Sequence, residues 1–199
     1  MATTAQVWAL YDALPRAYRN MLLLGAFAGL RPGEIAALKR SDVDWTSPSI
    51  EVRTQHDDAE LKTEASAGVV PIPADLAKML EADAGETFIV PGVFGRGVTA
   101  WHLNDVWATT RATIRALPEG FRIQDLRHYF ASLLIAAGLD IKVVQTRMRH
   151  ASPVITLRTY AHLWPDTDDT SRAAVADVLS ARKSPPGADP EGSSSDSAD

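Results

Sequence analysis

The sequence predicts a mainly α-helical protein with a small antiparallel β-sheet, an α+β class. Three observations support this prediction. Apolar residues recur at helical spacing over most of the chain, helix start and stop signals separate these segments, and two short β-rich runs flank a polar stretch between residues 49 and 73. With 199 residues and 46% hydrophobic composition, the chain is long enough for one sizeable core.

Three helical segments are expected before the sheet. The first follows a cap at Thr3 or Thr4 and ends before Pro15. The apolar stretch at residues 16–29 is typical of a buried helix, and Pro32 begins the third segment, because proline suits a first helical position. The runs "SIEVRT" and "AGVVPIP" then predict two antiparallel strands on either side of "QHDDAELKTEAS".

Helical spacing returns after the sheet, with a stop signal at Gly138 and caps at Asp140 and at the pair Ser152 and Pro153. The five tryptophans are expected in the core. Six helical segments are expected here: residues 74–84, 98–117, 122–138, 141–149, 154–163 and 166–182.

Composition narrows the class of protein. There is no cysteine, so neither a disulfide framework nor thiolate metal ligands are available. Apolar runs such as "MLLLGAFAGL" are shorter than the roughly 20 residues that span a bilayer, and the N-terminus lacks the zones of a signal peptide. We therefore expect a cytoplasmic protein with no membrane partner.

The net charge of −5 argues at first against a nucleic-acid partner. However, four of the 25 acidic residues and none of the 20 basic ones lie in residues 184–199, so residues 1–183 carry only −1. The last 16 residues are mostly Ser, Pro, Gly and acidic residues, a composition typical of a disordered tail. We expect one domain over residues 1–183 and an acidic tail over residues 184–199.

Two arginines stand among apolar residues. Arg31 directly follows "GAFAGL", and Arg127 lies in "IQDLRHYF". A partly buried arginine requires anionic or hydrogen-bonded partners, because an uncompensated buried charge is costly. The two guanidinium groups either form internal ion pairs, with Glu34 and Asp125 as candidates, or bind an anionic ligand.

Four segments in order resemble motifs of the catalytic domain of tyrosine recombinases, the phage-integrase type. The resemblance covers about residues 4–180 and implies the helical fold of that domain. A lone "DLRH" is weak evidence, whereas four ordered motifs are specific. The segments are "AGLRPGEIAALKRSDVDW", "LKTEASAGVVPIP", "QDLRHYFASLLIAAGLDIKVVQTRMRHAS" and "TLRTYAHL".

The resemblance implies a role for each matching position. Arg31 and Arg127 match the two arginines that grip the scissile phosphate, and Tyr160 matches the nucleophile. His150 matches the last histidine before the nucleophile, ten residues upstream of it. Guanidinium groups offer paired donors to the charge that develops on phosphate oxygens, and tyrosine, with a pKa of about 10, requires a proton acceptor to attack at neutral pH.

Two further positions complete the implied site. Lys62, between the predicted strands, matches the lysine that acts as general acid on the departing DNA oxygen, and Glu34 matches a supporting acidic position. Attack by tyrosine conserves the phosphodiester energy in the protein–DNA link, so the resemblance implies no cofactor, metal or ATP.

Three departures from the family pattern stand out. Gln124 replaces the histidine that begins "HxLRH" and cannot take a proton near neutral pH, so either cleavage is slower or a base comes from elsewhere, with His128 and His150 as options. Taken by itself, His128 is expected to be a polar surface or satisfied core histidine. Arg149 replaces a glycine, where it either contacts DNA backbone or crowds the turn. Ala67 and Gly68 stand where a basic residue is common, so a weaker grip on DNA is expected.

The resemblance implies a site-specific DNA recombinase, prokaryotic or phage-encoded, that acts on double-stranded DNA as a homo-oligomer, a tetramer, through a 3′-phosphotyrosine intermediate. The family's N-terminal DNA-binding domain does not precede Ala5, so an isolated catalytic domain is expected. Two alternatives stay open. One is a DNA-binding or regulatory remnant that cleaves poorly because of Gln124, and the other is a helical interaction protein without a DNA role.

Overall fold

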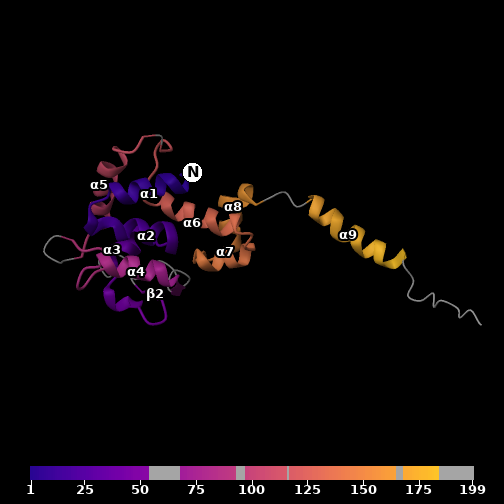
Figure 1. The fold of residues 1–199 in the computed structure, drawn as a ribbon, viewed down its shortest axis with the longest axis horizontal. Coiled ribbons are helices and arrows are strands. Elements are labelled where there is room, and N and C mark those ends of the chain that lie inside the picture. Colours follow the sequence, from indigo (N-terminus) through magenta and orange to yellow (C-terminus); the bar gives the residue numbers. More distant parts are fainter. Residues whose placement is uncertain (54–67, 93–96, 116, 165–167, 184–199) are drawn as a thin grey trace, which may run out of the picture. The chain divides into compact units, whose positions relative to one another are not determined.

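The computed structural model divides into two units, residues 1–164 and residues 165–199 (Figure 1). Helix α9 (Asp168–Lys183) belongs to the second unit. The expected acidic tail over residues 184–199 lies outside the described residues. The structure describes residues 1–53, 68–92, 97–115, 117–164 and 168–183.

The first unit is mainly helical with a small antiparallel sheet, as predicted, and its short 3₁₀ helices link some of the α-helices. Its described strands are β1 (Val43–Asp44), β2 (Ser49–Val52) and β3 (Gly68–Pro71). Its described α-helices are α1 (Thr4–Ala13), α2 (Arg19–Ala28), α3 (Pro32–Ala37), α4 (Ala74–Asp83), α5 (Ala100–Arg111), α6 (Asp125–Ala136), α7 (Ile141–Arg147) and α8 (Pro153–Tyr160).

The predicted caps set the starts of several helices. The Thr3 hydroxyl accepts from the backbone N–H of Gln6 and begins α1. The Asp140 carboxylate accepts from two backbone N–H groups and begins α7, and Ser152 caps α8 directly before Pro153. These side chains satisfy helix donors that have no partner within the helix, which fixes where each helix begins.

Some predicted helices are shorter than expected. The segment at residues 16–29 begins with a 3₁₀ turn, η1 (Arg16–Tyr18), before α2. Helix α5 ends at Arg111 rather than near residue 117. Helix α3 ends at Ala37, because Leu38 is extended with φ −66° and ψ 119°. Boundaries depend on local backbone geometry that hydrophobic spacing does not report.

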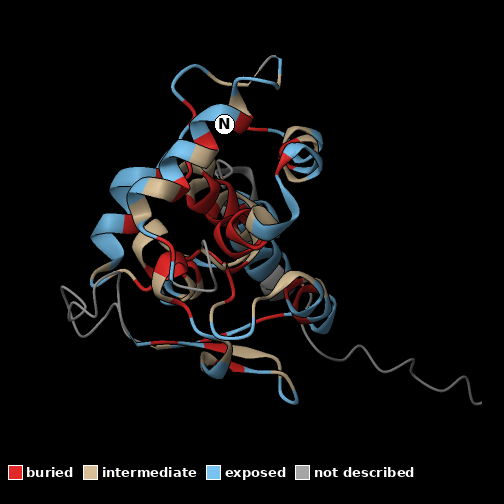
Figure 2. Cartoon of the chain, turned by 90° about the vertical axis from the view of Figure 1, so that its left-hand side faces the viewer, coloured by how far each residue is buried: buried red, intermediate tan, exposed pale blue. Residues whose placement is uncertain are grey.

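The core is built around α2, which packs against α1, α3, α4 and α6 (Figure 1). Buried positions gather on the central helices in Figure 2. Gly25 lets α6 approach closely, since a Cβ there would lie 3.0 Å from Leu126 Cβ. Every residue from Asn20 to Ala26 is buried, which agrees with the predicted buried helix.

The sheet has the order β1-β2-β3, with both pairs antiparallel. Val52, the last residue of β2, pairs with Gly68, the first residue of β3. Ile50 and Val52 face the core while Glu51 is exposed, the alternation expected of a sheet with one buried face. Lys62 belongs to the connection at residues 54–67 and lies outside the described residues.

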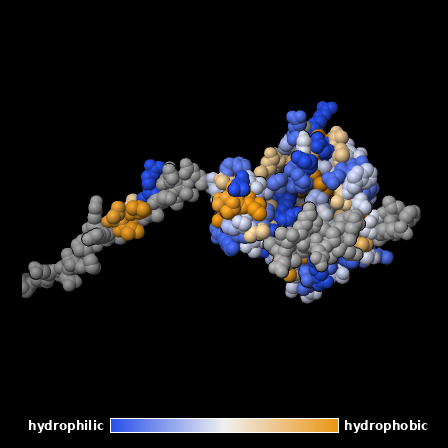
Figure 3. All heavy atoms as spheres, turned by 180° about the vertical axis from the view of Figure 1, so that it is seen from behind, coloured by the Kyte–Doolittle hydropathy of each residue, from blue (hydrophilic) through white to orange (hydrophobic). Residues whose placement is uncertain are grey.

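The expectation that all tryptophans are buried is wrong for Trp101, which is 75% exposed, although Trp107 is only 2% exposed. Leu103, Trp107 and Thr110 form the inward face of α5, and Trp101 lies about 200° around the helix from Leu103. On the face seen in Figure 3, the coloured apolar surface gathers in a few places among largely polar residues.

Candidate active site

Arg31 is positioned by the link between α2 and α3. Helix α2 ends at Ala28 and is capped by Gly29, whose φ of 65° suits glycine and where a Cβ would collide with the Phe130 ring at 2.5 Å. Arg31 then caps α3 through Glu34, which accepts from the Arg31 backbone N–H at 2.8 Å and from Nη1 at 2.7 Å. The predicted ion pair with Glu34 is confirmed, and the Arg31 side chain remains 34% exposed.

Arg127 lies on α6 and is 8% exposed. Its Nη1 donates to the Gly29 carbonyl and its Nη2 to the Met148 carbonyl, so it joins the ends of α2 and α7. Burial, with repulsion from Arg31 and Arg149, lowers the pKa of Arg127 to about 9, which leaves it charged at neutral pH. No ion pair with Asp125 occurs in the described structure, so that candidate partner is wrong.

Arg149 is buried and 7% exposed. Its φ of 49° is the left-handed conformation, which glycine adopts without strain. Its Nη2 donates to Glu34 Oε2, while Nε and Nη1 find no hydrogen-bond partner among the described residues. Burial lowers the pKa of Arg149 and the Glu34 carboxylate opposes this. A Cβ at Gly68 of β3 would lie 3.8 Å from Arg149 Cδ, so the side chain runs close to this strand. Contact of Arg149 with DNA backbone stays a prediction, which the burial of the side chain disfavours.

Arg31 and Arg149 therefore share the buried carboxylate of Glu34, and Arg127 adds a third guanidinium charge close to them. Glu34 is the one buried carboxylate among the described residues. The balance of charge is positive in a region where unpaired charge is costly. An anion that binds at the exposed side of Arg31 and Arg127 would offset this excess, and bidentate guanidinium donors fit phosphate oxygens.

His150 lies in the turn between α7 and α8. Its Nδ1 shares a hydrogen bond of 2.8 Å with the Thr156 hydroxyl, and its ring is stacked on Tyr160 with centroids 6.5 Å apart. Burial, then repulsion by Arg127 and Arg31, lowers the pKa of His150 to about 4. The imidazole is therefore neutral at neutral pH and offers a hydrogen bond rather than a charge.

Tyr160 is the last residue of α8, and its ring packs with Phe130, Val144 and Met148. Its hydroxyl lies 2.6 Å from Nδ1 of His128. Burial raises the pKa of Tyr160 to about 12, although the charge of Arg127 acts in the opposite direction. The hydroxyl therefore keeps its proton at neutral pH unless a neighbouring group accepts it.

These side chains meet at one polar cavity of about 260 Å³. It contains five of the six predicted catalytic residues, while Lys62 lies outside the described residues. Glu34 is not among the lining residues and forms an ion pair with Arg31. Gln124 reaches it from the N-cap position of α6. The lining residues are Arg31, Pro32, Gln124, Arg127, His128, His150, Thr159 and Tyr160.

Comparison with known proteins decides the family. Residues 2–166 match the model of the phage integrase family. The chain belongs to the phage integrase family, the tyrosine recombinases. The tyrosine recombinase XerA of Thermococcus onnurineus is 34% identical over 160 residues, which cover 73% of this chain and 52% of that protein. The chain thus spans about half the length of the curated relatives that it matches.

Solved phage integrase family members share the fold. The Tn1549 transposon integrase in complex with transposon right end DNA aligns with a TM-score of 0.72 at 19% identity, covering 89% of this chain and 65% of that one. The catalytic domain of bacteriophage HP1 integrase aligns with a TM-score of 0.55 at 21% identity, covering 87% and 93% respectively.

His128 is the site residue to which sequence reasoning gave no firm place. It was expected as a polar surface or satisfied core histidine, with a role as base only as one option. Its position four residues after Gln124, one helical turn along α6, was the available signal. Whether that turn faces Tyr160 depends on the packing of α8 on α6, which spacing alone does not give.

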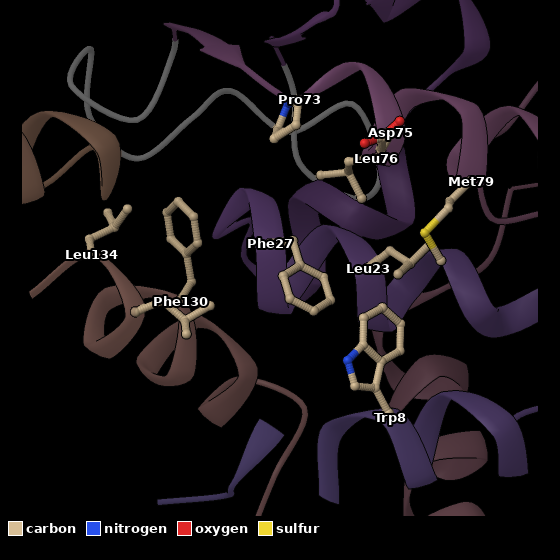
Figure 4. A pocket seen from close by; sticks show the side chains of 10 residues that line it. Trp8, Leu23, Phe27, Pro73, Asp75, Leu76, Met79, Phe130 and Leu134 are labelled. Atoms are coloured by element: carbon tan, nitrogen blue, oxygen red, sulfur yellow. The ribbon is translucent and has the colours of Figure 1, made fainter. Parts of the chain in front are cut away.

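A second cavity, of about 330 Å³, is lined almost wholly by apolar side chains (Figure 4). Trp8, Leu23, Phe27 and Met79 line it from α1, α2 and α4. Among the described residues that line it, Asp75 is the one ionisable residue, whereas several ionisable groups converge on the polar cavity. Within the described part of the chain, no helix is long and apolar enough to cross a membrane.

Proposed function

We propose that the chain is the catalytic domain of a site-specific DNA recombinase, which cleaves and rejoins strands through a 3′-phosphotyrosine intermediate. The observation that carries this proposal is the convergence of Arg31, Arg127, His150 and the Tyr160 hydroxyl on one polar cavity. Membership in the phage integrase family supports the same activity. Double-stranded DNA is the proposed partner, with a domain over residues 1–183.

The proposed reaction begins with the scissile phosphate in the cavity. Arg31 and Arg127 hold its non-bridging oxygens, which gain negative charge as the phosphorus becomes five-coordinate. Neutral His150 adds a hydrogen bond there without adding charge. Arg149 and Glu34 fix the orientation of Arg31 from behind the cavity. The positive excess of the three arginines is thereby offset by substrate.

Tyr160 Oη then attacks phosphorus, the bond from phosphorus to the 5′ oxygen breaks, and a 3′-phosphotyrosine link forms. Lys62, outside the described residues, is the proposed donor of a proton to the departing 5′ oxygen. Rejoining reverses these steps with the 5′ hydroxyl of another strand. The phosphodiester energy is kept in the tyrosine ester throughout, so no nucleotide hydrolysis is required.

We also propose a homo-oligomer, a tetramer, on DNA. Recombination of two duplexes cuts four strands, and each chain offers one nucleophile. The exposed apolar residues Val175, Val178 and Leu179 share one face of α9 and suit contact with another protein surface. We infer that the protein acts in the cytoplasm of a prokaryote, where its DNA substrate lies.

The test is covalent capture. The 199-residue chain is incubated with nicked duplexes of randomised sequence in chelator, denatured, and separated by size. Cleavage beside the nick releases a short strand that diffuses away, so the protein–DNA adduct accumulates. The proposal expects an adduct with the wild type and none with Tyr160→Phe. No wild-type adduct at any protein concentration, or equal adduct from both proteins, would contradict it.

The alternative of a poorly cleaving DNA-binding remnant rests on Gln124, which lines the cavity and cannot accept a proton. In that case the wild type binds DNA without forming an adduct. Gln124→His then restores cleavage, because it supplies the base at the family position. The same capture experiment therefore separates the two functions.

A further inference from the structure

His128 has an unassigned contact with the attacking group. Its Nδ1 lies 2.6 Å from the Tyr160 hydroxyl, across 32 positions of sequence. The two rings are tilted by 58° with centroids 5.6 Å apart, so the contact is through the ring edge. In the tautomer that carries its proton on Nε2, His128 accepts from the hydroxyl through Nδ1.

The opposite edge of His128 faces a carboxylate. Asp125, one turn earlier on α6, places Oδ1 3.9 Å from His128 Nε2, within ion-pair range though longer than a hydrogen bond. Asp125 Oδ2 accepts from the Arg122 backbone N–H at 2.6 Å, which holds the carboxylate at the start of the helix. A carboxylate here favours the Nε2–H tautomer and offsets the charge of an imidazolium.

The other groups of the cavity are poor acceptors for this proton. The Nδ1 atom of His150 is bonded to Thr156, and its ring stacks on the Tyr160 ring without reaching the hydroxyl through a hydrogen bond in the described structure. The pKa of His150, about 4, also makes it a weak base. Gln124 has no proton-accepting nitrogen or carboxylate.

We propose that His128 is the general base of the cleavage step and that Asp125 is its positioning residue, which together replace the histidine missing at Gln124. This inference rests on the proposed strand-transfer function. As the bond from Tyr160 Oη to phosphorus forms, the phenolic proton passes to His128 Nδ1. The P–O5′ bond breaks with its electron pair on the 5′ oxygen, which takes its own proton from a separate acid. On rejoining, His128 returns the proton to Tyr160.

Burial supports the need for such an acceptor, because the pKa of Tyr160 is raised to about 12. The environment of His128 contains charges of both signs. Arg127 and Arg31 face the cavity side, and the acidic groups lie on the other side of the ring. The titratable and charged groups around it are Met1, Arg31, Glu119, Asp125, Arg127, His150 and Tyr160.

The test uses the duplex enriched by covalent capture and measures the single-turnover rate of adduct formation between pH 5.5 and pH 9. His128→Gln keeps a polar side chain but cannot carry the proton, so the rate should fall about 100-fold. The wild-type rate should fall on acidification, because a protonated imidazole accepts nothing. In His128→Gln the rate of adduct formation should instead rise with hydroxide concentration. His162→Gln, an exposed histidine two residues after Tyr160, is the matched control.

Two further variants separate a proton-transfer role from a structural one. His128→Ala should regain cleavage when imidazole is added, which a packing defect would not do. Asp125→Asn should slow cleavage about tenfold and shift the pH profile, since it no longer stabilises the imidazolium.

An unchanged rate and pH profile in His128→Gln would overturn the inference. The proposed function would still stand in that case, because the wild type forms the adduct. Loss of activity in His128→Ala without rescue by imidazole would also overturn it. If the wild type forms no adduct at all, the proposed function itself fails and the inference fails with it. Thermal melting of each variant monitors folding, and the partly exposed His128 side chain, 43% exposed, makes its replacement tolerable.

Discussion

The two sides of the candidate site differ in burial and in how their charges are balanced. On the arginine side, Glu34 is 1% exposed, Arg149 7% and Arg127 8%, and each is held by ion pairs or carbonyl groups. On the tyrosine side, Tyr160 itself is buried, but the side chains of His128 and Asp125 are 43% and 28% exposed. The difference fits the proposed division of roles, in which the buried side holds the phosphate and the more accessible side exchanges a proton.

The largest effect is expected from Arg127→Lys on the arginine side. An ammonium cannot bond the Gly29 and Met148 carbonyls while presenting paired donors to phosphate. We expect adduct formation to slow by about 10³-fold, as for loss of a transition-state donor, with melting measured in parallel. Arg158→Lys, at an exposed position of α8, is the matched control. If the rate of adduct formation falls less than tenfold in a folded Arg127→Lys protein, the proposed division of roles is contradicted.

Glu34→Gln tests whether the arginine side is also a stability element. The substitution leaves Arg31 and Arg149 without their shared carboxylate, so we expect a loss of about 3 kcal/mol in the free energy of unfolding. For a chain of this size, the melting temperature should fall by about 6–12 °C. Glu81→Gln, which removes an exposed pair with Arg40, should cost less than about 1 kcal/mol. Equal losses in the two variants would contradict the prediction.

Arg149→Gly and Arg149→Ala test whether the backbone at Arg149 is strained. Both remove the same ion pair with Glu34, but only glycine adopts a φ of 49° without strain. Arg149→Ala should therefore be less stable than Arg149→Gly by about 1–2 kcal/mol in chemical unfolding. If the two variants are equally stable, the positive φ carries no cost at this position.

The smallest effect is expected from acidification. His150 has a pKa of about 4 in the folded protein and about 6.5 when unfolded, so the unfolded chain binds more protons between these values. This contribution is complete above pH 6.5 and is lost as pH falls toward 4. After allowance for partial exposure, we expect a loss of about 1 kcal/mol from pH 7 to pH 5, measured by urea unfolding. The slope should be smaller in His150→Gln than in His162→Gln, and equal slopes would contradict this cause.

Much of the fold could be predicted because its signals are local. Thr3, Asp140 and the pair Ser152 and Pro153 cap helices from within a few residues, and this part of the prediction is confirmed. Strand β1 was missed, because two residues carry no alternation to detect. Trp101 was expected in the core and is exposed, since composition says nothing about which face of α5 it occupies.

The candidate site was predictable to the extent that it follows ordered motifs. Arg31, Arg127, His150 and Tyr160 were chosen from such motifs, and the structure brings them to one cavity, while their roles stay predictions. The inward path of Arg149 could not be predicted, because it depends on a positive φ and on the buried Glu34 carboxylate. The role of Lys62 likewise stays a prediction.

The most direct test of the account is to locate the covalent bond. After capture of DNA and digestion of the duplex, trypsin should release residues 159–172, "TYAHLWPDTDDTSR", between Arg158 and Arg172. Tandem mass spectrometry should place the nucleotide remnant on Tyr160, the one tyrosine of that peptide. A remnant on any other residue, or none in the denatured complex, would contradict the claim that Tyr160 is the nucleophile.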